Sequence, residues 1–148
     1  MRNEYTDDYG QRVYVDMYVY FEFDQYNSRS LNGRGREVDY VGNESQELRF
    51  AWYIDPRTGN INIRYDNSGY TFVLDSRGNS QTSGFSLDDD YFSGVMEGVN
   101  NDELIYFDCA RTTWAKPSLP FTTQKKAAAA NDSVKLKYTD NLKFRSRQ

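Results

Sequence analysis

Carboxylates are the side chains of this 148-residue chain best suited to chemistry, and they form two candidate groups. Asp88, Asp89 and Asp90 are consecutive, whereas a calcium-binding EF-hand loop needs spaced ligands and a central glycine. We therefore predict that they form a solvated acidic turn. Asp16 and Glu22 share one extended segment. At ~3.3 Å per residue they lie about 20 Å apart, too far for the carboxylate pair of a glycosidase.

Neither a glycine-rich segment nor the cysteine indicates a catalytic or cofactor site. The segment Gly33–Arg36 resembles a phosphate-binding turn, but it lacks the preceding buried strand and the following helix, so a flexible loop is expected. Cys109 follows Ile105 and Phe107 in an apolar row, which predicts an inert core thiol. The chain has no histidine, which excludes most hydrolase triads and the commonest zinc ligand. We predict a non-enzymatic protein with no metal site and no cofactor.

Charge is distributed unevenly along the chain. Residues 1–112 contain ten Arg, no Lys and twenty acidic residues, a net charge of -10, whereas residues 113–148 contain six Lys, two Arg and two Asp, a net charge of +6. The acidic body would repel phosphates, so no nucleic-acid partner is expected. No segment has the length and apolar character of a membrane span.

A single long strand is predicted over residues 13–24. Odd positions from Val13 to Phe23 are apolar, whereas even positions from Tyr14 to Asp24 are Tyr, Asp or Glu. This period of two is typical of a strand with one buried face. We expect the odd positions, including Met17, to point inward and the tyrosines at positions 14, 18 and 20 to point outward.

Seven shorter strands are expected, around residues 36–41, 48–54, 61–65, 70–74, 79–87, 91–96 and 105–109. Three of the connections, at residues 55–60, 66–69 and 75–78, contain an Asp followed by a Gly, as tight turns do. Short turns between alternating segments predict an antiparallel meander. Gly94 and Gly98 indicate a bend or a close backbone approach within the seventh of these eight strands.

Eight antiparallel strands predict an all-β, up-and-down barrel, and a two-sheet β-sandwich is the alternative. We expect residues 1–11 to be frayed, residues 12–112 to form the barrel domain and residues 113–148 to form a basic tail. In the tail, Pro117 and Pro120 interrupt regular structure. Five apolar residues then fall on even positions and five basic residues on odd ones: Val134, Leu136, Tyr138, Leu142 and Phe144, and Lys135, Lys137, Lys143, Arg145 and Arg147. This second alternating segment could add a strand to the acidic body, pair with another chain, or remain disordered.

A barrel of eight strands has room either for a packed core or for one small ligand. The tyrosines on the outside of the first strand are also suited to stacking against a sugar or a partner protein. If the interior holds a ligand, the candidate lining residues are Met17, Phe21, Phe50, Trp52, Tyr65 and Phe72.

The long first strand, the strand Phe50–Ile54, the segment Asp55–Tyr65 and the later glycine-punctuated strands resemble the small lipocalin-like barrels of secreted bacterial lipoproteins. The resemblance extends over about residues 12–112. It implies a non-enzymatic binding role and an extracytoplasmic location, periplasmic or on the surface, if a signal peptide was removed; otherwise the chain is expected in the cytoplasm.

The sequence therefore predicts a binding module that encloses a small apolar ligand or presents its surface to a partner protein. The alternative is a structural or assembly protein whose basic tail pairs subunits. The sequence leaves the oligomeric state open.

Overall fold

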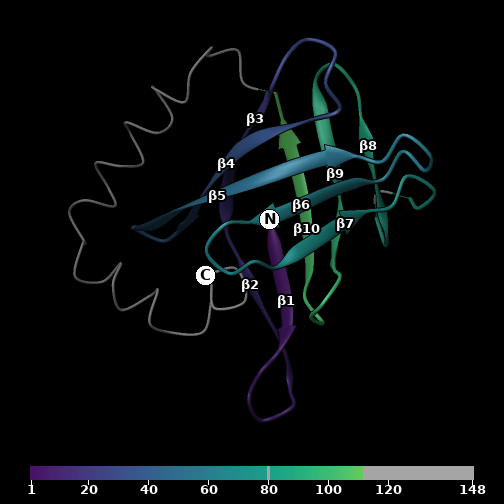
Figure 1. The fold of residues 1–148 in the computed structure, drawn as a ribbon. Coiled ribbons are helices and arrows are strands. Elements are labelled where there is room, and N and C mark those ends of the chain that lie inside the picture. Colours follow the sequence, from purple (N-terminus) through teal and green to yellow (C-terminus); the bar gives the residue numbers. More distant parts are fainter. Residues whose placement is uncertain (80, 112–148) are drawn as a thin grey trace.

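A computed structural model describes residues 1–79 and 81–111, and the predicted basic tail therefore lies outside the described residues. The described residues form one antiparallel sheet of ten strands that curls into a half-barrel (Figure 1). This confirms the all-β prediction and agrees with the up-and-down barrel, whereas the alternative of two packed sheets does not form. No helix able to cross a membrane occurs in this part of the chain. The strands are β1 (Arg2–Thr6), β2 (Arg12–Asp16), β3 (Tyr18–Gln25), β4 (Asn32–Val41), β5 (Glu44–Ile54), β6 (Ile61–Tyr65), β7 (Thr71–Leu74), β8 (Gly84–Leu87), β9 (Tyr91–Gly98) and β10 (Leu104–Ala110).

The strand order is β2-β1-β10-β9-β7-β6-β5-β4-β3, with β8 paired to β9 outside this path. All eight expected strands are present, but β8 does not separate β7 from β9 as a simple meander requires. Instead, β7 pairs with one end of β9 and β8 with the other. The reason is length, because β9 has eight residues whereas β7 and β8 have four each and fit end to end along it.

The predicted long first strand is present as β2 and β3, which are separated at Met17. Its alternation persists through the break, so that Met17 is buried, whereas Tyr14 and Tyr18 are exposed. β2 pairs with β1, whereas β3 pairs with β4. The two ends of the sheet are therefore two halves of one continuous segment.

The expectation of a frayed N-terminus at residues 1–11 is wrong. Residues Arg2–Thr6 form β1, which pairs with β2 on one side and with β10 on the other. The Asp7 carboxylate accepts hydrogen bonds from the backbone N–H groups of Tyr9 and Gln11, at 2.9 and 2.8 Å, and so closes the turn that follows. Alternate residues of β1, Asn3 and Tyr5, are buried. The turn, the pairing on both sides and the buried side chains of Asn3 and Tyr5 together keep β1 in the sheet.

The expected loop before the second strand is also shorter than predicted, because Gly33–Arg36 belongs to β4. The Phe50 ring lies where a Cβ atom on Gly35 would be, and the Asp24 carbonyl lies where one on Gly33 would be. The two glycines thus provide space for a ring and a backbone rather than flexibility.

Aromatic rings form a continuous row through the core. Phe21 contacts Phe50, Phe50 contacts Tyr65 and Tyr65 contacts Phe72, all edge to face, with ring centroids 6.3, 5.7 and 5.7 Å apart. The Tyr65 hydroxyl donates a hydrogen bond to the carboxylate of Glu37, which is fully buried. The part of the interior around these four rings is therefore filled by side chains.

Candidate functional site

A cleft of about 610 Å³ lies where β3 faces β10, with the turn between β8 and β9 at its rim. We call it the aromatic cleft. Its lining includes Phe21, Phe23, Trp52, Phe92 and Cys109. The size falls within the range of small-molecule pockets, about 300–1,000 Å³.

The rings of the aromatic cleft hold one another in place. Phe23 contacts Phe50, Trp52 and Phe92, with centroid distances of 5.3, 6.1 and 5.9 Å, each edge to face. The Trp52 indole N–H donates to the Arg34 carbonyl at 3.0 Å, which fixes the indole plane. Phe23 nevertheless remains 36% exposed. A ligand would therefore meet an ordered apolar surface with an accessible ring.

The rim of the aromatic cleft is acidic. Asp88, Asp89, Asp90 and Asp108 line it, together with Arg111 and with Met1, which carries the N-terminal ammonium group. The Asp88 carboxylate accepts hydrogen bonds from the backbone N–H groups of Asp90 and Tyr91, at 2.8 and 2.7 Å. These two hydrogen bonds hold the pKa of the Asp88 carboxyl below its usual value, so it is charged at neutral pH. The described residues contain no group of three or more side chains that could hold a metal ion.

Cys109 lines the aromatic cleft from β10, and burial raises the pKa of its thiol to about 11. A pKa of about 11 leaves roughly 0.1% thiolate at pH 8, and only the thiolate is nucleophilic. We expect iodoacetamide to alkylate Cys109 at pH 8 about a hundredfold more slowly in the folded protein than in urea. Because the chain has one cysteine, mass spectrometry measures this rate directly. Equal rates in the two states would contradict the predicted inert thiol.

The six candidate lining residues separate into three groups. Phe21 and Trp52 line the aromatic cleft. Met17 lines a second cavity, of about 650 Å³, beside the N-terminus. The other three, Phe50, Tyr65 and Phe72, are fully buried and line neither cavity.

Sequence reasoning did not assign Phe23 and the acidic turn Asp88–Asp90 to the site. Phe23 belongs to the inward row of the first strand, so extending that row would have found it. The turn was correctly predicted to be solvated, and the predicted meander already joins β8 and β9 as a pair. Its place at the cleft depends on how the sheet curls to bring β3 opposite β10, for which the turn sequence gives no signal.

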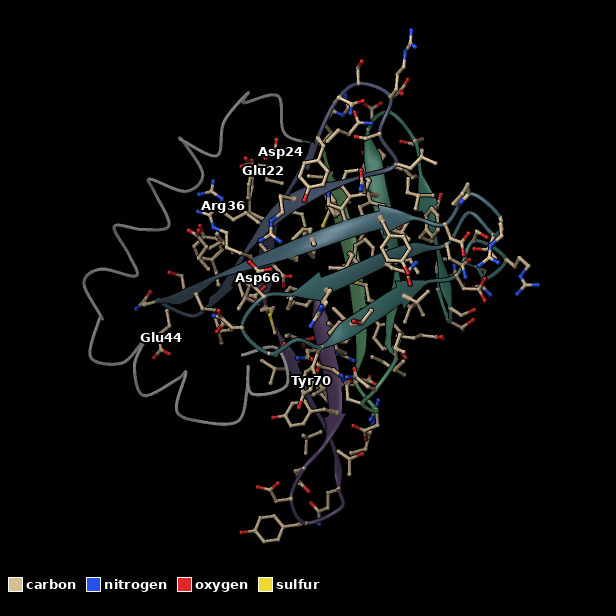
Figure 2. The ribbon with its side chains drawn as sticks, viewed as in Figure 1. Glu22, Asp24, Arg36, Glu44, Asp66 and Tyr70 are labelled. Atoms are coloured by element: carbon tan, nitrogen blue, oxygen red, sulfur yellow. The ribbon has the colours of Figure 1, made fainter. Side chains whose placement is uncertain are left out.

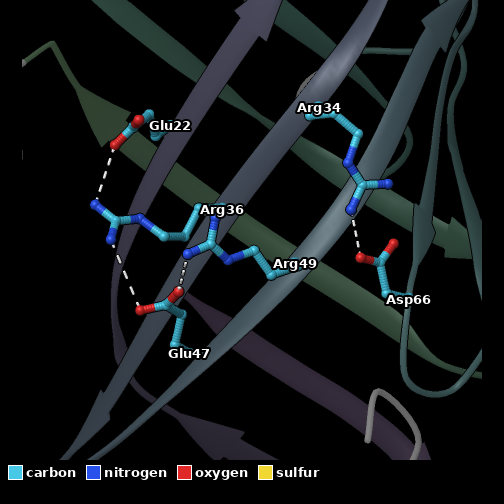
Figure 3. A network of polar contacts seen from close by, with 6 residues as sticks. All are labelled: Glu22, Arg34, Arg36, Glu47, Arg49 and Asp66. Carbon is cyan, nitrogen blue, oxygen red and sulfur yellow. Dashed lines mark hydrogen bonds and ion pairs between the residues drawn. The ribbon is translucent and has the colours of Figure 1, made fainter.

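A network of ion pairs covers the outer face of β3, β4 and β5 (Figure 3). Arg36 lies 3.2 Å from Glu22 and 3.7 Å from Glu47, which also pairs with Arg49 at 2.8 Å. The two carboxylates and two guanidinium groups balance one another. Figure 2 shows Asp24 beside Glu22, outside this balanced group. Arg34, also on β4, pairs instead with Asp66.

Comparisons of the chain with protein-family models, with curated proteins and with solved structures found no match.

Proposed function

We propose that this protein is a non-catalytic binding module whose aromatic cleft takes an amphipathic ligand with an apolar body and a positively charged group. The observation that carries this proposal is the combination of ordered rings and acidic rim in a single cleft. Ligand pockets are typically apolar, with a few polar groups that set orientation.

The charge of the rim favours cations over anions. Four carboxylates outnumber the two cationic groups among the lining residues, the Arg111 guanidinium and the Met1 ammonium group, so the mouth attracts positive charge and repels negative charge. Rings such as Phe23 and Trp52 add favourable contact with both alkyl chains and ammonium groups. An alkyl ammonium compound has both properties and serves as a probe of the cleft.

We also propose that the protein is extracytoplasmic and related to lipocalin-like domains. The resemblance to lipocalin-like domains of secreted bacterial lipoproteins supports an extracytoplasmic role, and the curled antiparallel sheet is compatible with it. The lack of histidine supports a role in binding rather than catalysis.

Fluorescence titration tests the proposed ligand chemistry. The chain has two tryptophans, so a Trp114→Phe background leaves Trp52 as the reporter. Dodecyltrimethylammonium, below its micellar concentration, is expected to bind at least tenfold more tightly than dodecyl sulfate. Phe23→Ala should weaken the cation's binding about tenfold, which corresponds to about 1.4 kcal/mol.

The matched control is Tyr53→Ala, because Tyr53 is exposed and does not line the aromatic cleft. It should leave the affinity unchanged. Equal affinity for the two amphiphiles, or equal loss in both variants, would refute the proposal. Urea unfolding of each variant separates loss of binding from loss of the fold.

A further inference from the structure

The aromatic cleft begins where β1 starts. Arg2 of β1 lies opposite Asp16 on one side and Tyr106 on the other. Met1 continues this pairing, because its backbone N and O atoms each bond to Met17, at 2.8 Å. In Figure 1, β1 runs away from the N label, while β10 continues in the opposite direction past it. The walls on either side of β1 therefore extend beyond its first residue.

β1 pairs with β2 on one side and with β10 on the other. If these two registers are continued past Met1, they define a slot between β3 and the end of β10. One step further, Tyr18 faces Asp108, and the next step brings Val19 opposite Cys109. The same four residues line the aromatic cleft, together with Met1. Two adjacent strand spacings amount to about 10 Å, which is the width that one intervening strand needs. No described strand lies between β3 and this end of β10.

The two faces of the slot differ in chemistry. Val19, Phe21 and Cys109 belong to the inward rows of β3 and β10, so an inserted strand would meet apolar side chains there. On the outward rows, Asp108 is exposed at one end of the slot, and Asp24 is exposed one residue beyond its other end. Because neighbouring strands share their alternation, the slot fits a strand that is apolar on its inner face and basic on its outer face.

We infer that residues 134–138 of this chain, Val-Lys-Leu-Lys-Tyr, insert into the slot as a β-strand. The apolar residues Val134, Leu136 and Tyr138 would face the rings, while Lys135 and Lys137 would face the outward carboxylates. The five residues fit within the slot, whose wall on β3 extends over six residues, from Tyr18 to Phe23. Addition of an extended segment to sheet edges is a common mode of peptide recognition.

The connection permits this insertion. The chain leaves β10 beside the slot at Arg111, which itself lines the aromatic cleft. Twenty-two residues, 112–133, then precede the inserting segment. The slot is about 20 Å long at ~3.3 Å per residue, so the connection has ample reach. Entering from the Arg111 end, the segment would run antiparallel to both β3 and β10.

This inference rests on the proposed function in one respect, because both assign the aromatic cleft as a binding surface. Residues 134–138 and an amphipathic ligand would contact the same rings and share the carboxylate of Asp108. The segment would then act as a built-in competitor, which a ligand must displace before it binds. The tail would then regulate the access of a ligand to the aromatic cleft.

Disulfide trapping in the full chain tests the insertion. Cys109 is the single cysteine, so each of five variants, Val134→Cys, Lys135→Cys, Leu136→Cys, Lys137→Cys and Tyr138→Cys, has one partner for it. Diamide at pH 9 is the oxidant, and it is reduced as the disulfide forms. We expect an intramolecular disulfide to form at least tenfold faster at the best even position than at either odd one, because only inward side chains reach Cys109. All five should cross-link when unfolded in urea, which controls for thiol chemistry.

Three outcomes would overturn the inference: equal rates at odd and even positions, no cross-link in the folded protein despite cross-linking in urea, or disulfide-linked dimers, which would assign the slot to a second copy. Hydrogen exchange gives an independent measurement. Leu136→Asp should raise exchange at the slot-facing amides of β3 at least tenfold relative to Leu142→Asp, a matched change outside the inserting segment. Equal exchange in the two variants would also overturn it.

Adding dodecyltrimethylammonium separates the two proposals. Slower cross-linking in its presence is expected if ligand and segment share the aromatic cleft. Cross-linking at even positions that the amphiphile does not slow would support insertion and count against the ligand proposal. Binding of the amphiphile without any cross-linking in the folded protein would support the ligand proposal and count against insertion.

Discussion

Phe50→Ala should lower the free energy of unfolding by about 3–5 kcal/mol, measured by urea denaturation. Phe50 is fully buried and contacts Phe21, Phe23 and Tyr65, so its removal deletes edge-to-face contacts with all three rings. The Gly35 backbone beneath the ring carries no side chain that could fill the cavity. Since domains are typically stable by about 5–15 kcal/mol, this variant loses a large part of the total.

The control for this prediction is Tyr53→Ala on the same strand. Tyr53 points away from the core and is 53% exposed, so we expect a change within about 0.5 kcal/mol. A small effect of Phe50→Ala, comparable to that of the control, would show that the half-barrel interior is not packed around this ring. Both variants remove a ring from β5, so a difference between them measures burial rather than strand propensity.

Gly84→Ala should destabilise the protein by about 2–5 kcal/mol, for two separate reasons. Gly84 has φ of 79°, a left-handed conformation that an L side chain adopts at a cost of about 1–2 kcal/mol. A Cβ atom would also overlap the Asp75 carbonyl oxygen and lie 2.7 Å from the Cα atom of Gly78. Overpacking of this kind adds about 1–3 kcal/mol. Thermal and urea unfolding measure the sum.

Gly10→Ala separates these two reasons. Gly10 has nearly the same φ, 77°, but a Cβ atom there would meet nothing within 4 Å. This variant should therefore lose only the backbone term of about 1–2 kcal/mol. The difference between the free energies of unfolding of the two variants then measures the cost of the overlap at Gly84. Equal losses would mean that the segment around Asp75 and Gly78 moves aside without cost.

Local sequence patterns predicted the strands well, because the alternation that marks a strand and the residues that mark a turn each lie within a short segment. The alternation from Val13 to Phe23 predicted both the long strand and its buried face. The Asp55 turn was predicted for a similar reason, and Asp55 does accept the Arg57 backbone N–H at 2.9 Å. Gly59 in that turn has φ of 77°, as the turn chemistry requires.

Pairing between distant strands was harder to predict, because the sequence within each strand does not specify its neighbour. β1 was missed because its short alternation is weak and its stability comes from β2 and β10 together. β8 was placed wrongly because its position depends on the length of β9. For the same reason, the aromatic cleft was only partly predicted. Phe21 and Trp52 were assigned from their inward positions, whereas the acidic rim required knowledge of how the sheet curls to bring β3 opposite β10.

The pairing of β1 with β10 also has a kinetic consequence. Most neighbouring strands in this sheet are close in sequence, as in the hairpins β3–β4 and β5–β6, and such contacts close short loops. By contrast, Arg2 pairs with Tyr106, near the opposite ends of the described chain. Loop-closure entropy grows with the separation of the paired residues, and folding slows as contacts become less local. We therefore expect the hairpins to form early and the contact between β1 and β10 to form late as this sheet assembles.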